Sequence, residues 1–144
     1  MSKIKGISGV LKNFKIYSKA LRSDLTLEVF KSVTKIELKA KQVVPVDLGK
    51  LKQSIYHKMN YQKSIGEVGA TEFYAPFIEF GTGTNVQIPS GYEDFAMTFY
   101  VNGKGTLRPR PFLIPSFLEG KKELTDNTQK IVEKYSGLKS IKRL

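Results

Sequence analysis

Cysteine and tryptophan are absent from this 144-residue chain, and there is a single histidine, His57. Without cysteine the chain has no disulfide framework, no thiolate metal ligand and no thiol nucleophile. One histidine also excludes a multi-histidine metal site within a single chain. No apolar run approaches the ~20 residues that are needed to cross a bilayer. The N-terminal lysines precede no apolar signal-peptide core, so we expect a cytoplasmic protein with no secretion signal and no membrane contact.

Acidic residues are scarce as well, because 13 Asp and Glu oppose 24 Lys and Arg and give a formal net charge of +11. The basic excess lies in residues 1–52 and 108–144, while residues 53–107 are slightly acidic. Such asymmetry indicates a nearby polyanion, usually nucleic acid or an acidic protein surface. The alternative is that lysine-rich helix faces are simply solvated. Twenty of the basic residues are lysine, which favours diffuse electrostatics over base reading by arginine.

Helical spacing dominates both ends of the chain. Apolar residues three and four positions apart predict helix through the first forty residues, either continuous or restarted at Ser23–Asp24. Pro45 disfavours helical geometry in the preceding residue, so this helix should end near Val44. A last helix is expected over 116–135, because the prolines of 108–115 keep that stretch extended. The expected apolar stripe of the last helix consists of Phe117, Leu124, Ile131 and Tyr135.

The middle of the chain predicts a short helix followed by strands. A helical turn is expected over 48–54. Two extended runs, 55–61 and 65–70, are joined by polar residues and indicate a β-hairpin. Residues 84–107 are expected to form a long excursion that holds a strand near 96–101, since Asn-Gly at its end is a strong turn signal.

Together these elements predict one α+β domain over residues 1–144. It consists of a long N-terminal helix, an antiparallel sheet with a long loop excursion, and a C-terminal helix. The folded core should span about residues 20–135, followed by a basic, flexible tail over 136–144.

The sequence carries no catalytic or cofactor motif. The turn at 81–84, Gly-Thr-Gly-Thr, lacks the Gly-Lys-[Ser/Thr] of a P-loop, and the fingerprint G-x-G-x-x-G is absent. Asp47 and Glu79 could form an acid–base pair or a metal site, but structural roles suit them better. Asp47 is placed to be the N-cap of the short helix, and Glu79 lies in an apolar run where one charge can pair across an interface. His57 should lie beside a core or interface, so we expect no enzyme, no cofactor and no metal.

Residues 73–84, FYAPFIEFGTGT, form an unusually apolar segment that ends in a glycine turn. Its large side chains are Phe73, Tyr74, Phe77, Ile78 and Phe80. Their spacing fits a strand or a short helix, and the Gly-Thr turn lets the backbone leave sharply. A packed segment that opens into a long excursion is typical of a protein that docks on others. We expect the apolar residues of 84–107 to become ordered against a neighbouring molecule.

Three blocks, VPVDLGKLKQSI, YAPFIEFGT and RPRPFLIPSF, follow the basic helix in this order. They resemble the motifs of the gene-product-ten-like family of the Hong Kong-97 type, which are neck or tail-completion components of tailed phages. The first block matches the family pattern at Pro45, Val46, Asp47, Gly49, Leu51, Ser54 and Ile55. The second block matches at Tyr74, Ala75, Ile78, Glu79, Phe80, Gly81 and Thr82, and the third at Arg108, Pro109, Pro111, Phe112, Leu113 and Pro115. Leu48 replaces the threonine that is usual in the family, which argues against a threonine cap there.

The resemblance implies a non-enzymatic α+β subunit that is related to connector and tail-terminator folds. Such proteins assemble as rings around the channel through which DNA leaves the phage head. We accordingly expect a ring-shaped homo-oligomer, with six subunits as the working number, that contacts neighbouring connector and tail proteins. The expected location is the virion, with assembly in the host cytoplasm.

Two other functions stay open at this level. The basic helices could carry a small DNA-binding module, and Asp47 with Glu79 could carry a metal-dependent hydrolase. In a conduit, contact with DNA should be transient and independent of sequence, because the duplex must slide. The lysines that would face DNA are Lys31, Lys35 and Lys39 on the first helix and Lys121 and Lys122 on the last.

Overall fold

The computed structural model describes the backbone of residues 7–94 and 104–136 and the side chains of 18–94 and 104–135. The elements along the chain are α1 (Ile7–Val43), α2 (Gly49–Ser54), β1 (Ile55–Asn60), β2 (Ile65–Ala70), α3 (Ala75–Phe80), the 3-10 turn η1 (Gly83–Asn85) and α5 (Leu113–Ser136). The expected α+β class, with a long helix first and a helix last, is confirmed. The expected strand near 96–101 and nearly all of the expected tail lie outside the described residues.

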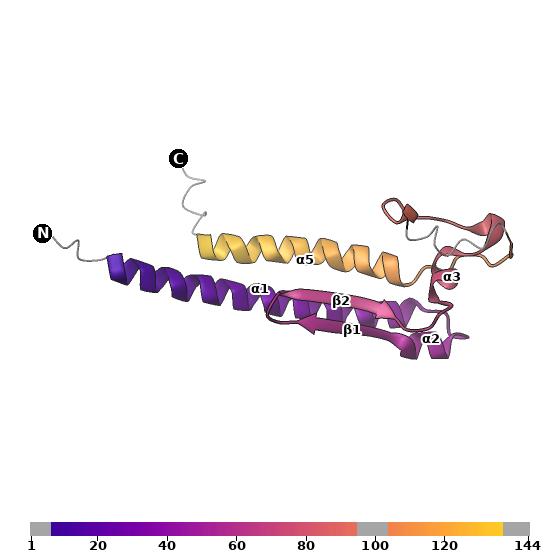
Figure 1. Ribbon diagram of the computed structural model, residues 1–144, viewed down its shortest axis with the longest axis horizontal. Coiled ribbons are helices and arrows are strands. Elements are labelled where there is room, and N and C mark those ends of the chain that lie inside the picture. Colours follow the sequence, from indigo (N-terminus) through magenta and orange to yellow (C-terminus); the bar gives the residue numbers. More distant parts are fainter. Residues whose placement is uncertain (1–6, 95–103, 137–144) are drawn as a thin grey trace, which may run out of the picture.

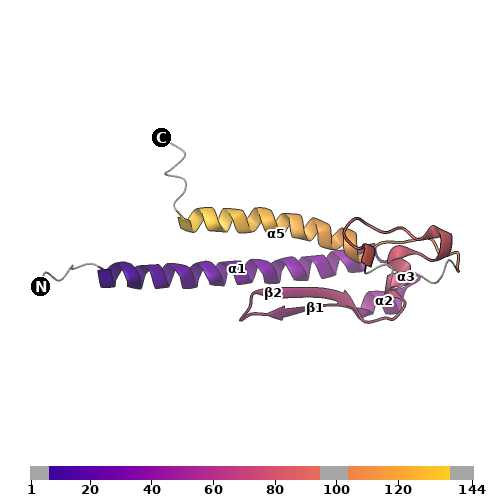
Figure 2. The same cartoon turned by 45° about the horizontal axis from the view of Figure 1, so that its top comes forward.

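The long helix α1 is the centre of the molecule, since α5 packs on one side of it and the β1–β2 hairpin on another. Figure 2 shows the resulting stack of α5, α1 and hairpin from one edge. The two long helices are antiparallel, so the described chain begins and ends at the same end of a rod (Figure 1). With 37 residues, α1 is about 55 Å long. In the described residues, no helix is long and apolar enough to span a membrane.

The hairpin lies close to α1 because glycine occupies the position of β2 that faces Val33. β1 and β2 pair antiparallel from Ile55↔Ala70 to Asn60↔Ile65, which confirms the predicted hairpin. A Cβ on Gly66 would lie 2.3 Å from Cγ1 of Val33 on α1. Glycine at this position therefore allows the sheet to approach the helix closely.

Of the two alternatives for the first helix, the structure has the continuous one, because α1 runs without interruption past Ser23–Asp24. Two expectations about the last helix need correction. α5 begins at Leu113, three residues earlier than expected, so that Pro115 lies in its first turn. Proline is tolerated there because the amides of the first turn have no intrahelical acceptor. Phe117 is 39% exposed and does not belong to the buried stripe; Ser116 is buried instead.

Candidate functional site

The three sequence blocks meet at the end of the rod where α2, α3 and the start of α5 lie (Figure 1). We call this region the motif end. Its core contains side chains of α1 and of all three blocks. The buried members are Ala40, Val44, Leu51, Ile55, Ala75, Ile78 and Phe112. Residues that are far apart in the sequence thus share one small apolar core.

Glu79 connects α3 to the start of α5 at the motif end. The sequence-based expectation was an ion pair across an interface, and the structure differs from it. Its carboxylate is buried, with 6% of the residue exposed. One oxygen accepts hydrogen bonds from the backbone N–H groups of Phe112 and Leu113, and the other from that of Ile114, all at 2.9 Å. These are the first amides of α5, which have no acceptor within the helix, and the helix dipole favours a negative charge beside them. Glu79 therefore caps α5 from a distance.

Asp47 does not cap α2, contrary to the sequence-based expectation. The N-cap residue is Leu48, and α2 has no side-chain cap. Asp47 instead forms an ion pair with Arg110, with 3.2 Å between Nη1 and Oδ1. The ion pair joins the first and third blocks. Both side chains are well exposed, so the pair contributes little to the stability of the fold.

The Gly-Thr turn after α3 closes onto the third block rather than forming a phosphate cradle. Thr82 N–H donates to the carbonyl of Leu107, and Leu107 N–H donates to the hydroxyl of Thr82, both at 2.9 Å. Arg110 N–H donates to the carbonyl of Ile78. Gly81 has φ of +78°, and a Cβ there would lie 2.8 Å from the carbonyl oxygen of Leu107. Only glycine fits both the backbone conformation and the close approach.

An apolar groove opens at the motif end between β2, α3 and the first turn of α5. Its volume is about 430 Å³. The lining runs from Val68 through Ala75 and Pro76 to Phe80 and includes Phe112–Ile114. The carboxylate of Glu79 contributes to this wall, but its charge is taken up by three amides. The groove thus presents a mainly hydrophobic surface.

Large apolar side chains also project from the motif end. Phe73 is 82% exposed and stands at the groove, with its ring edge-on to Tyr74. Val46, in the turn between α1 and α2, is fully exposed. Scattered apolar residues such as Val46 are ordinary on a surface, but an exposed phenylalanine at an apolar groove indicates a protein-binding site.

His57 lies against α1, as expected for a structural role. Its Nδ1 is hydrogen-bonded to Glu37, which also pairs with Lys41, and its ring stands edge-on to that of Phe30 at 5.9 Å. Burial of Glu37 opposes its ionisation, but the hydrogen bonds from Lys41 and His57 outweigh this and lower the pKa of the carboxyl. The group ties the hairpin to α1.

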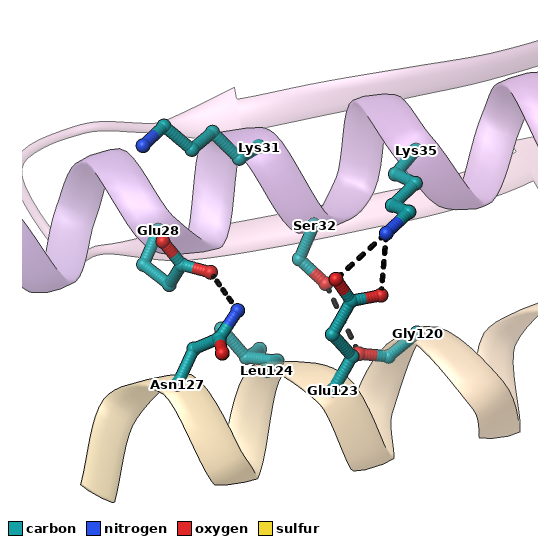
Figure 3. A pocket seen from close by; sticks show the side chains of 8 residues that line it. All are labelled: Glu28, Lys31, Ser32, Lys35, Gly120, Glu123, Leu124 and Asn127. Carbon is teal, nitrogen blue, oxygen red and sulfur yellow. Dashed lines mark hydrogen bonds and ion pairs between the residues drawn. The ribbon is translucent and has the colours of Figure 1, made fainter. Parts of the chain in front are cut away.

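The seam between α1 and α5 is polar, and it contains three of the five lysines expected to face DNA, Lys31, Lys35 and Lys39. Lys35 binds both carboxylate oxygens of Glu123, at 2.6 and 2.7 Å, and Lys39 pairs with Glu119. Figure 3 shows the polar hollow of about 320 Å³ along this seam. The side chains of Glu28, Lys31, Ser32, Lys35, Glu123, Leu124 and Asn127 line it, together with Gly120.

No chemistry is assembled from the two carboxylates considered for a hydrolase. Glu79 is occupied by backbone amides and Asp47 by Arg110. Over residues 7–94 and 104–136, no group of three or more His, Cys, Asp or Glu side chains could hold a metal ion. The arrangement positions chain segments and leaves an apolar surface open.

The sequence offered one signal for the role of Glu79. The stretch before α5, RPRPF, contains no Ser, Thr, Asp or Asn that could cap the helix locally. A helix without a local cap needs a distant acceptor, and Glu79 is the one acid in the apolar run. The Arg110–Asp47 pair and the groove had no comparable signal.

The comparison with known proteins agrees with this picture of a binding subunit. The model of a family described as "Bacteriophage HK97-gp10, putative tail-component" matches residues 9–81. This span contains the first block and all but the last residue of the Tyr74–Thr82 match. No curated protein and no solved structure shows a significant match. Because the matched span covers just over half of the chain, the chain belongs to the HK97-gp10-like family of phage tail components.

Proposed function

We propose that the chain is a tail-completion subunit that assembles into a homo-oligomeric ring, with six copies as the working number, at the head–tail junction. The ring surrounds the path of the DNA and contacts neighbouring connector and tail proteins. Membership of a family of phage tail components supports the structural role and the virion as its location. Assembly in the host cytoplasm is part of the proposal.

The observation that carries the proposal is the character of the motif end. Its charged motif residues satisfy one another internally, as Glu79 does with α5 and Asp47 does with Arg110. Phe73, Val46 and the groove add exposed apolar surface to this end of the molecule. An apolar surface held in place by a polar framework suits docking on protein better than catalysis.

Light scattering after size separation tests self-assembly. We expect the wild-type chain to form a defined oligomer and Phe73→Ser to shift it toward monomer. The melting temperature should hardly change, since Phe73 is 82% exposed. Val132→Ser is the matched control, because Val132 is 42% exposed on α5 and does not line the groove. A chain that stays monomeric at every concentration would contradict the proposal.

Transient contact with DNA is the second part of the proposal. Within the described part of the chain, the side chains of Lys31, Lys121 and Lys122 are exposed and form no hydrogen bond or ion pair. Lys35 and Lys39, by contrast, are paired with glutamates of α5. The free lysines support weak, sequence-independent contact with phosphates. The same exposed lysines would also favour the alternative function, a small DNA-binding module.

A further inference from the structure

We propose that the two outer edges of the β1–β2 hairpin pair with each other between copies of the chain. β1 of one copy would add to the sheet beyond β2 of the next, so that the sheet continues from subunit to subunit. This inference rests on the proposed self-assembly and names the surface through which it occurs.

The hydrogen-bond register shows which backbone groups the edges offer. Thr71 N–H donates to the carbonyl of Ser54, so residues 54 and 71 form a hydrogen-bonded pair. In an antiparallel ladder such pairs alternate with pairs whose backbone groups point outward. The outward-pointing residues are His57 and Met59 on β1 and Gly66, Val68 and Ala70 on β2, while Ile55 at the start of β1 is buried in the core. Each strand therefore carries a regular row of N–H and C=O groups along its free edge.

Both edges are open in the described structure. The sheet has two strands only, and both strands pack on α1, through His57 with Glu37 and Gly66 with Val33, so that α1 covers one face of the sheet. Neither strand contains a proline, and the pairing has no bulge, so two of the usual devices that protect an edge are missing. Two strands alone make a marginal sheet, and an added strand would extend it.

The apolar groove lies directly beside the edge of β2. Val68–Thr71 form one of its walls, and α3 and the start of α5 form the others. An extended chain that pairs with β2 would place alternate side chains in this groove, as in other cases of strand addition. The groove therefore gives the β2 edge both space and a hydrophobic contact.

Charge selects the β1 edge of another copy as the occupant. The stretch 49–60, which holds α2 and β1, contains Lys50, Lys52 and Lys58 and no acid. The stretch 65–72 contains Glu67 and Glu72 and no base. Pairing of unlike edges brings opposite charges together, whereas pairing of like edges brings like charges together. Unlike edges make a head-to-tail contact, which generates a ring where the rotation between subunits closes, whereas like edges would make a two-fold dimer.

Amide hydrogen exchange resolved by residue is the first test. In the monomer fraction, the amides of His57, Met59 and Val68 should exchange fast, while the inward amides of Tyr56 and Glu67 are protected. Assembly should slow the outward set by about tenfold or more and leave the inward set almost unchanged. If the outward amides exchange equally fast in monomer and oligomer, the edges are not paired and the inference is overturned.

A charge reversal is the second test. Lys52→Glu alone and Glu72→Lys alone should each weaken assembly by about tenfold at low salt, and the double variant should restore it. Lys130→Glu, an exposed charge change on α5 away from both edges, should have no effect. If oligomers form but neither charge reversal weakens assembly, the edge pairing is refuted and the proposed function is retained. If no oligomer forms under any condition, both the edge pairing and the proposed function are refuted.

Discussion

At the scale of single residues, Glu79 shows how one side chain can define a junction. A carboxylate in an apolar run is costly unless its charge is fully hydrogen-bonded, and three amides of α5 meet this need. The charge and the helix end are each unfavourable alone and stabilise each other. The same side chain joins the second and third blocks.

Replacement of Glu79 by alanine should lower the free energy of unfolding by about 2–4 kcal/mol, because three amides lose a charged acceptor and stay largely buried. Glu79→Gln keeps one acceptor oxygen and should cost less. Urea titration followed by circular dichroism measures both. Asp126→Asn, at an exposed carboxylate of α5 with no hydrogen bond in the described part of the chain, is the control. Equal midpoints for Glu79→Ala and wild type would show that the cap is dispensable.

The lowered pKa of Glu37 predicts that the free energy of unfolding depends on pH on the acid side. Its pKa is below the usual 4.5, because hydrogen bonds from Lys41 and His57 outweigh the effect of burial. Since the carboxyl ionises more readily in the folded state, its stabilising contribution is present above pH 4.5 and is lost as the pH falls through the lower, folded pKa. Glu37→Gln should flatten this acid-side decline in thermal melts between neutral and acidic pH. An unchanged slope would argue against the pair.

At the scale of elements, close approach decides how the layers pack. A Cβ on Gly120 of α5 would lie 2.2 Å from Cγ1 of Ile36 on α1. Alanine normally favours helix over glycine by about 1 kcal/mol, but here the overpacking should dominate and destabilise by about 1–3 kcal/mol. Gly49→Ala, whose Cβ would meet nothing within 4 Å, is the control and should be neutral or stabilising. A Gly120→Ala variant that melts higher than wild type would refute the contact.

The elements also show how far sequence reasoning reaches. The end of α1 near Pro45 and the hairpin follow from local rules, because proline sterics and strand alternation act over a few residues. The predicted start of α5 was wrong because the residue that caps this helix, Glu79, is more than thirty residues away in the sequence. The predicted capping role of Asp47 was wrong for a similar reason, because tertiary structure brings its partner Arg110 close to it. The groove likewise exists only after three separate segments have met.

At the scale of the whole molecule, the net charge of +11 predicts how the protein meets DNA. Affinity for two unrelated duplexes should be equal and weak and should fall steeply with salt, because binding releases counterions. Fluorescence anisotropy across a salt series measures this. Lys121→Glu with Lys122→Glu should reduce binding, and Lys63→Glu on the hairpin turn is the control. A tight, salt-resistant preference for one duplex would support the DNA-binding module instead.

The contacts at both ends of the excursion make the chain between them adjustable in length. Thr82 and Leu107 are held together by two hydrogen bonds, and Glu79 fixes the start of α5 independently. Doubling a closed loop costs only about 0.6 kcal/mol, so this stretch can lengthen with little effect on the fold. A short fluorescent or affinity tag inserted between Ser90 and Gly91, both exposed, should leave the melting temperature nearly unchanged. Such a tag would also test the expected docking of residues 84–107, because a tag within a docking segment should impair assembly while the melting temperature stays unchanged.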